Sequence, residues 1–251
     1  MLQSLEKSKT RKNLGITAIE GEKEIEMAMS AHLDLQTVFF LNEIVNSVFL
    51  KKIEVQYPNI EFLSLSKDLF AKISYRETTG GLIAIAKTKH IQLENLVLPE
   101  NPLILVVEGV EKPGNLGAIL RTADAAKIDA VICCEMPTDL YNPNTIRASL
   151  GTVFTVPIVI SNNHSTMEWL KTNKIQTFCT NLHHAKSYHL QDYKRACAFV
   201  LGTEATGVSD DWINFSDTNI KIPMLGKIDS MNVSVAAAII IFEAKRQRSF
   251  L

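Results

Sequence analysis

The sequence predicts an α/β fold, with a mostly parallel sheet in the larger, C-terminal part of the chain. The first observation is the uninterrupted apolar run over residues 103–107, which is typical of a strand buried on both faces. The second is the helical spacing of apolar residues over 115–126. The third is the recurrence of short apolar runs, because alternating strand and helix patterns favour a parallel sheet covered by helices. The further strand candidates are residues 130–134, 152–160, 175–180, 198–201 and 220–222.

A polar stretch between residues 87 and 102 separates this sheet domain from a smaller α/β module. We therefore predict two domains, residues 1–95 and residues 96–251. The smaller domain contains no group of residues that indicates catalysis. Its predicted elements are a helix within 19–29, strands over 38–41 and 60–65, a helix over 66–73 with Ser66 as N-cap, and a strand over 82–86.

The composition is that of a folded protein, because 46% of the 251 residues are hydrophobic and 21% are charged. No apolar run reaches membrane-spanning length, and the N-terminus lacks the apolar core of a secretory signal, so we expect a cytoplasmic protein without membrane contact. The net charge of −1 counts against nucleic-acid binding. Basic clusters at residues 7–12 and 245–248 are either phosphate contacts or solvated ends of the chain.

The cysteines and histidines form no metal-binding pattern. No cysteine pair has C-x-x-C spacing, so we expect buried, reduced thiols and no metal. The sequence also has no dinucleotide-binding fingerprint, no complete phosphate-binding loop and no nucleophile elbow. These absences weaken the alternative of a different α/β enzyme that acts on a nucleotide or another small molecule.

The first motif that indicates chemistry is P-G-N-L-G-A-I-L-R over residues 113–121. Pro113 and Gly114 predict a turn, and Asn115 is well placed to cap the following helix. Arg121 shares a helix face with small residues rather than with other charges, which indicates that something packs closely there. An ordinary surface arginine on an amphipathic helix explains this segment equally well.

The second motif is L-G-T-E-A-T-G over residues 201–207. Gly202 directly follows a predicted buried strand, where a glycine allows a ligand or another stretch of backbone to come close. Glu204 then lies at the strand exit. The alternative interpretation is a strand-ending turn with a capping carboxylate.

The third motif comprises I-P-M-L over residues 222–225 and D-S-M-N-V-S over residues 229–234. The second of these segments holds four hydrogen-bonding side chains within six residues. The following helix, from residue 235 to about residue 244, is apolar nearly all round, so it must be buried on more than one face. A subunit interface is the natural partner for its second face.

Taken together, these segments resemble the SpoU (TrmH-like) family of RNA 2′-O-ribose methyltransferases, within the SPOUT superfamily. The resemblance covers nearly all of residues 103–246. The segments N-L-G-A-I-L-R-T-A, Y-N-P-N-T-I-R-A-S-L-G, L-G-T-E-A-T-G and I-P-M-L-G-K-I-D-S-M-N-V-S-V-A-A-A follow the family's order and spacing. Residues 20–21 and 79–82 resemble, more loosely, the small ribosomal-protein-like RNA-binding domain that many members carry.

The resemblance implies a sheet domain with a deep trefoil knot near the C-terminus, and a homodimer formed through that domain. It also implies S-adenosylmethionine as the methyl donor, held mainly by backbone groups of the knot. Carried over motif by motif, the donor contacts are Gly202, Ile222 and Met231, with Leu225 nearby. The family usually has leucine at position 231 and often has asparagine at position 203, where this chain has threonine.

The residues implied in catalysis surround a ribose 2′-hydroxyl. This group is a poor nucleophile until it loses its proton, so the enzyme must align it with the methyl group and help to remove the proton. By resemblance Arg121 is the central residue. It acts either as the base or, because arginine is very hard to deprotonate, as a group that holds phosphate and stabilises the forming alkoxide. The implied supporting residues are Asn115, Glu204, Ser230 and Asn232, with Arg147 and Ser149 on the RNA side.

The sequence thus predicts 2′-O-methylation of structured RNA. Ribosomal RNA is favoured over transfer RNA because of the two-domain organisation. A catalytically silent RNA-binding protein is a second hypothesis, which predicts RNA affinity without methyl transfer. The presence together of Arg121 and its four supporting residues argues against it.

Overall fold

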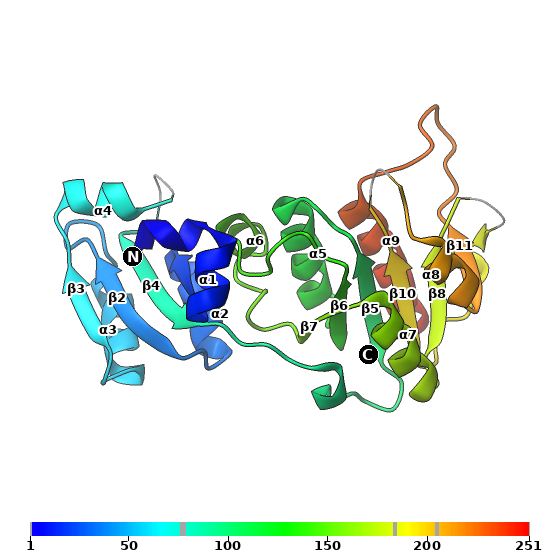
Figure 1. Ribbon diagram of the computed structural model, residues 1–251, viewed down its shortest axis with the longest axis horizontal. Coiled ribbons are helices and arrows are strands. Elements are labelled where there is room, and N and C mark those ends of the chain that lie inside the picture. Colours follow the sequence, from blue (N-terminus) through cyan, green and yellow to red (C-terminus); the bar gives the residue numbers. More distant parts are fainter. Residues whose placement is uncertain (1, 76–78, 183–184, 204–205, 251) are drawn as a thin grey trace. The chain divides into compact units, whose positions relative to one another are not determined.

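A computed structural model describes residues 2–75, 79–182, 185–203 and 206–250 of the chain (Figure 1). Contacts within the chain divide it into two compact units. The first unit comprises Met1–Lys89 and Asp139–Thr155, and the second comprises His90–Thr138 and Val156–Leu251. Among the described residues, no helix is both long enough and apolar enough to cross a membrane.

The second unit contains a seven-stranded sheet of order β7-β6-β5-β10-β8-β11-β9, in which neighbouring strands run parallel. This sheet confirms the predicted fold class. Its strands are β5 (Leu103–Glu108), β6 (Ala130–Cys134), β7 (Ile158–Ser161), β8 (Gln176–Thr180), β9 (Lys186–Ser187), β10 (Cys197–Leu201) and β11 (Thr218–Lys221). The helices are α5 (Pro113–Ala125), α7 (Asn163–Thr172), α8 (Asp210–Phe215) and α9 (Val233–Gln247), with short 3₁₀ turns η2 (Leu93–Asn95) and η3 (Tyr188–Leu190).

Helices cover both faces of this sheet. On one face, Ile104 and Val106 of β5 belong to a buried cluster with Leu170 of α7 and Trp212 of α8. Side chains alternate along a strand, so the other residues of β5 point to the opposite face. Helix α9 contacts β10 and packs against α5. Burial of the central strands on both sides explains why their sequences are continuously apolar.

Four of the predicted strands, at residues 103–107, 130–134, 175–180 and 198–201, are confirmed to within one residue at each end. The strand predicted over 152–160 is wrong in its first part, because residues 151–155 form turns and β7 begins at Ile158. Gly151 has a φ of +84°, and Pro157 has no N–H for a strand ladder. Val153 and Val156 are buried outside any strand, which accounts for the misleading apolar pattern.

Helix α5 begins earlier than predicted. Lys112 is its N-cap and Pro113 is its first residue, a position that suits proline because its φ is already helical and its missing N–H would be unpaired anyway. Asn115 therefore lies in the first turn, and its predicted capping role is wrong. Helix α9 is longer at both ends than the predicted helix.

The first unit contains a four-stranded sheet of order β1-β4-β2-β3, in which β4 runs antiparallel to β1 and β2. Phe70 of α4 packs with Ile83 of β4, and α3 lies on the opposite side of the sheet from α4 (Figure 1). The strands are β1 (Ile16–Glu20), β2 (Leu35–Phe40), β3 (Glu61–Ser64) and β4 (Leu82–Lys87). The helices are α1 (Ser8–Leu14), α2 (Glu22–Ser30), α3 (Ser47–Gln56), α4 (Lys67–Ile73) and α6 (Pro143–Ala148), after the 3₁₀ turn η1 (Leu2–Glu6).

The helix predicted within residues 19–29 is wrong at its start. Residues up to Glu20 belong to β1, and Gly21, with a φ of +105°, turns the chain before α2 begins at Glu22. Helix α3 was not predicted. The helix over 66–73 is confirmed, and the Ser66 side chain caps it by accepting a hydrogen bond from the Leu69 N–H at 3.4 Å.

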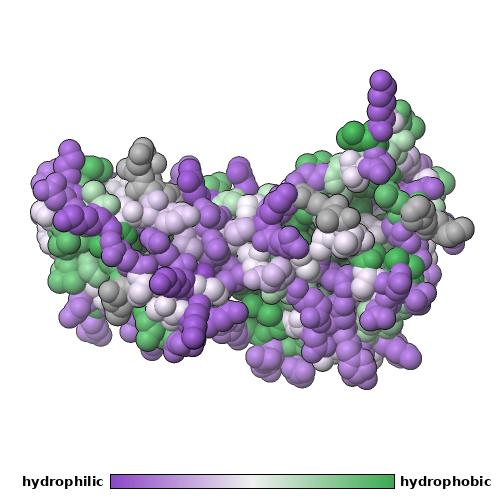
Figure 2. Space-filling model, turned by 45° about the horizontal axis from the view of Figure 1, so that its top comes forward, coloured by the Kyte–Doolittle hydropathy of each residue, from purple (hydrophilic) through white to green (hydrophobic). Residues whose placement is uncertain are grey.

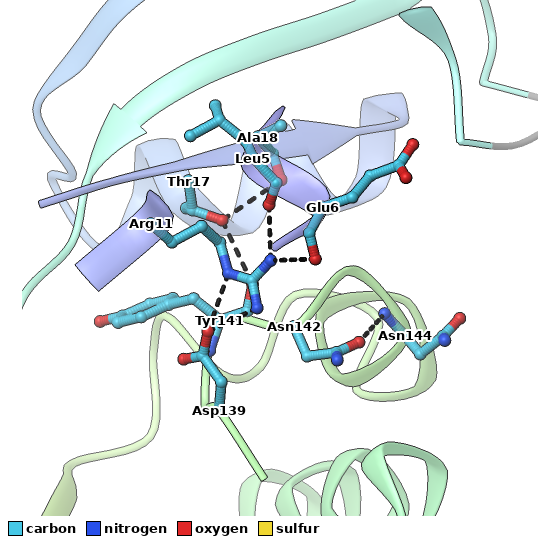
Figure 3. Close-up of polar contacts among 9 residues, drawn as sticks. All are labelled: Leu5, Glu6, Arg11, Thr17, Ala18, Asp139, Tyr141, Asn142 and Asn144. Atoms are coloured by element: carbon cyan, nitrogen blue, oxygen red, sulfur yellow. Dashed lines mark hydrogen bonds and ion pairs between the residues drawn. The ribbon is translucent and has the colours of Figure 1, made fainter. Parts of the chain in front are cut away.

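A buried arginine attaches the segment Asp139–Thr155 to the N-terminal part of the first unit (Figure 3). Arg11 is 2% exposed, and its Nε donates to Asp139 Oδ2 at 2.8 Å. Its Nη1 donates to the main-chain oxygens of Leu5 and Glu6 at 2.5 and 2.8 Å. Because an unpaired buried charge is costly, this cluster fixes the segment firmly.

Close packing holds the remainder of the segment in place. The Tyr141 hydroxyl donates to the Lys89 carbonyl at 2.5 Å and accepts from the Lys89 N–H at 3.0 Å. A Cβ at Gly151 would lie only 2.8 Å from Met27 Cβ of α2. Ser149 is fully buried and donates to the Ile146 carbonyl at 2.9 Å, whereas Arg147 is exposed.

The basic cluster at the end of the chain is largely used within the fold. Arg248 donates to the main-chain oxygens of Tyr193 and Asn101, each at 2.7 Å, and also to that of Arg195. Arg246 pairs with Glu243 at 2.8 Å. Hydrophilic side chains dominate the face drawn in Figure 2, with hydrophobic ones in small groups between them.

Candidate active site

A cleft of about 450 Å³ lies beyond the carboxyl ends of three neighbouring strands, β8, β10 and β11. Ligands of parallel sheets usually bind at this edge, because the loops that leave adjacent strands meet there. The described lining residues are Thr180, Asn181, Leu182, Leu201, Gly202, Thr203, Thr206, Gly207, Val208, Asp210, Ile213, Ile220, Lys221, Ile222, Met224, Asp229, Ser230, Met231, Val233 and Ala236.

The loop after β10 forms one wall of the cleft. The Thr203 N–H donates to the Gly207 carbonyl at 2.9 Å, and the Gly207 N–H donates back to the Thr203 carbonyl at 3.1 Å. A Cβ at Gly202 would lie 2.0 Å from the Gly207 oxygen, so glycine is required for this close turn. The second motif therefore brings backbone close to backbone. Glu204 lies outside the described residues.

The loop after β11 forms the opposite part of the lining and extends away from the sheet (orange in Figure 1). Ser230 and Met231 line the cleft, and the Ser230 hydroxyl donates to Asp229 Oδ1 at 3.2 Å. Met224 also lines it. Leu225, which was predicted to lie near the donor, is 97% exposed and is not part of the lining.

The first and third motifs meet through a pair of asparagines. Asn232 Nδ2 donates to Asn115 Oδ1 at 3.2 Å, where α5 packs against α9. The Asn232 side chain also caps α9, because its Oδ1 accepts from the Ser234 N–H at 3.0 Å. Arg121 is an exposed residue of α5 and does not line the cleft.

The structure thus brings together six of the nine predicted site residues, in two sets, and Arg121 and Leu225 belong to neither. Gly202, Ile222, Met231 and Ser230 line the cleft. Asn115 and Asn232 form a hydrogen-bonded pair, and Asn232 lies between Met231 and Val233, which both line the cleft. Sequence reasoning missed the lining residues that follow β8 and the charged residues Asp210 and Lys221. The exit of the predicted strand at 175–180 was the signal that could have identified residues 180–182.

The cleft has the size and chemistry of a small-molecule site. Its volume falls within the range of about 300–1,000 Å³ that is usual for ligand pockets. Apolar side chains such as Leu201 and Ile220 share the lining with two carboxylates and one ammonium group. This mixture suits a ligand that combines a flat aromatic ring with charged groups, as S-adenosylmethionine does.

The cysteines do not contribute a nucleophile. Burial raises the pKa of the Cys133, Cys134 and Cys179 thiols to about 12, so they stay protonated at neutral pH. All four cysteines are buried and free, as predicted. Within the described residues, no His, Cys, Asp and Glu side chains are grouped as ligands of a metal ion would be.

Comparison with known proteins gives two family matches. Residues 102–242 match the model of the SpoU rRNA Methylase family. Residues 1–84 match the model of an MRM3-like substrate binding domain.

Individual relatives match over nearly the whole chain. The chain is 29% identical to the 23S rRNA (guanosine(2553)-2′-O)-methyltransferase RlmP of Bacillus subtilis, over 97% of this chain and 94% of that protein. A crystal structure of an RNA 2′-O ribose methyltransferase is 35% identical, with a TM-score of 0.85, over 99% of this chain and 95% of the other. The crystal structure of an AdoMet-bound rRNA methyltransferase from Sinorhizobium meliloti is 25% identical, with a TM-score of 0.90, over 98% of this chain and 92% of the other.

Proposed function

We propose, from the premise that this chain belongs to the SpoU rRNA methylase family, that it methylates a ribose 2′-hydroxyl of ribosomal RNA with S-adenosylmethionine as the donor. The observation that carries this proposal is the cleft beyond β8, β10 and β11. Residues of the second and third sequence motifs, among them Gly202, Ile222 and Met231, line this cleft. RlmP of Bacillus subtilis, which matches nearly the whole chain, is named as an rRNA 2′-O-methyltransferase, and one related structure contains the donor.

The donor, when bound, supplies a methyl group that is already activated on a sulfonium. We assign its binding to Gly202, Ile222 and Met231, which line the cleft, with Leu225 in the adjoining loop. The tight turn at Gly202 keeps side-chain bulk out of the site, and main-chain groups near it are then available to the ligand.

The remaining task of the protein is to align and activate the ribose hydroxyl. In our proposal, Arg121 holds the neighbouring phosphate and stabilises the alkoxide as it forms, because a guanidinium stays charged at neutral pH. The hydrogen bond between Asn115 and Asn232 holds the N-terminal ends of α5 and α9 in position near Arg121. Ser230 and Glu204 complete the set, and exposed Arg147 contacts RNA.

We further assign substrate RNA binding to residues 1–95 and methyl transfer to residues 96–251, with a trefoil knot near the C-terminus. The match of residues 1–84 to a substrate binding domain supports this division. Action on ribosomal RNA also supports a cytoplasmic location.

An exposed apolar stripe on α9 supports a homodimer formed through the methyltransferase domain. Val235 and Phe242 are 49% and 43% exposed on this helix, and Ile239 between them is partly exposed.

Replacement of Phe242 with glutamate should convert the dimer to a monomer, because a charge is costly in an apolar interface. Light scattering after gel filtration measures the change in mass. The matched control is Phe250→Glu, at an exposed position outside α9. A wild-type protein that is monomeric at micromolar concentration would contradict the dimer.

The proposed function is tested by mapping methyl transfer. The protein is incubated with labelled S-adenosylmethionine and total RNA from cells that lack it, and the labelled nucleotide is located. We expect label on a ribose of ribosomal RNA. Label on a base would contradict 2′-O-methylation, and label on transfer RNA alone would replace the substrate. RNA binding with no transfer would favour the silent protein.

A further inference from the structure

A buried carboxylate supports the donor cleft from behind. Glu108 is the last residue of β5, is 8% exposed and does not line the cleft. One of its oxygens accepts the Ser209 main-chain N–H at 2.8 Å. The other accepts from Asn163 Nδ2 at 2.5 Å.

This pair of hydrogen bonds is part of a longer buried network. Asn163, the first residue of α7, accepts the indole N–H of Trp212 at 2.9 Å through its Oδ1. Trp212 in α8 is fully buried. Both ends of the network, the Ser209 N–H and the Trp212 N–H, can only donate. The two residues between them must therefore supply one carboxylate and one amide.

The network ends at the wall of the cleft. Ser209 lies between Val208 and Asp210, and both of these residues line the cleft. The residue after Glu108 lies close to the same wall, because a Cβ at Gly109 would be only 3.0 Å from Thr203 Cγ2. The end of β5 thus supports the loop after β10 at two points.

We propose that Glu108 is a positioning residue for the methyl donor, acting through Ser209 on the loop that forms the cleft wall. This inference rests on the proposed function, because it assigns the cleft to S-adenosylmethionine. Neither Glu108 nor Asn163 belongs to the residues assigned to RNA, so changes at Glu108 are expected to alter binding of the donor and not of the RNA.

The test exploits the fixed donor and acceptor pattern. The Glu108 carboxylate accepts from both the Ser209 N–H and the Asn163 amide, whereas the Glu108→Gln side chain has only one oxygen and an NH₂ group that must donate. Rotating the Asn163 amide would let its oxygen accept from this NH₂ group, but its own NH₂ group would then face the Trp212 N–H, which also needs an acceptor. Asn163→Asp alone places two carboxylates in contact. The double variant Glu108→Gln/Asn163→Asp restores every hydrogen bond with almost the same shape, because the new amide donates to the new carboxylate.

The readouts are the donor dissociation constant from calorimetry, the KM values for donor and RNA, and the melting temperature. We expect each single variant to bind S-adenosylmethionine roughly tenfold more weakly, with the RNA KM unchanged, because a buried mismatch costs about this factor. The double variant should recover to within about threefold of wild type. The control Glu135→Gln, which keeps an oxygen for the Asn163 N–H, should bind as wild type does.

The proposal is overturned if folded single variants bind the donor normally, or if the double variant regains stability but not donor affinity. It is also overturned if all three variants fail to fold, because Glu108 would then act on the fold alone. A wild-type protein that binds no donor would instead contradict the proposed function, which separates the two failures.

Discussion

Replacement of Arg121 with alanine is expected to lower the rate of methyl transfer at least about 100-fold, the usual cost of removing one group that stabilises developing negative charge. The fold should not change, because Arg121 is exposed on α5 and forms no ion pair with any residue that the structure describes. Donor binding should also be unchanged, because Arg121 does not line the cleft. Single-turnover kinetics and donor calorimetry on the same preparation check all three expectations.

Arg121→Lys distinguishes the two roles of this residue. Lysine keeps the positive charge but loses the planar fork that holds phosphate at two points, so partial activity is expected if charge stabilisation dominates. Arg246→Ala is the matched control, since Arg246 is exposed on α9 and pairs with Glu243. An Arg121→Ala protein that stays folded and transfers methyl groups at the wild-type rate would remove Arg121 from the mechanism.

Gly202→Ala is the second substitution with a large expected effect. The added Cβ would lie 2.0 Å from the Gly207 oxygen and 2.4 Å from the Val208 nitrogen, and both are main-chain atoms that cannot rotate away. The loop must open, so the paired hydrogen bonds between Thr203 and Gly207 are lost. Donor affinity should fall at least about 100-fold, equivalent to about 3 kcal/mol, measured by calorimetry.

Gly114→Ala provides the control for this prediction. A Cβ at Gly114 meets nothing within 4 Å, and alanine is favoured over glycine inside a helix such as α5. Its donor affinity and melting temperature should match or exceed those of the wild type. Wild-type donor binding by a folded Gly202→Ala protein would show that the loop after β10 is not part of the donor site.

The core of the sheet domain was predictable because its strands are buried on both faces. Residues 103–107 and 130–134 carry no polar side chain, a pattern that few other structures produce. Two of the residues that line the cleft were predictable for a different reason. Each of Gly202 and Ile222 directly follows a strand, and strand exits of a parallel sheet converge.

Other features depend on contacts that sequence spacing does not reveal. Val153 and Phe154 look like part of a strand, yet they lie in turns of the first unit. Asn115 looks like a cap, but Pro113 takes the start of the helix. The ion pair between Arg11 and Asp139 joins segments that are distant in the sequence. Sequence spacing could not predict it, because an arginine in a basic N-terminal cluster is usually a solvated surface charge.

That ion pair bears on how such a protein can evolve. Tyr141 and Gly151 lie inside the stretch that matches the methylase family, yet their packing partners, Lys89 and Met27, belong to the N-terminal module. The N-terminal module therefore provides the packing surface for residues Asp139–Thr155 of the methylase-family stretch. Recombination that exchanged this module for an unrelated one would leave Asp139 without its ion-pair partner Arg11 and would expose Ile146. The N-terminal module and the methyltransferase domain are expected to be inherited together, with compensating substitutions on both sides of this contact.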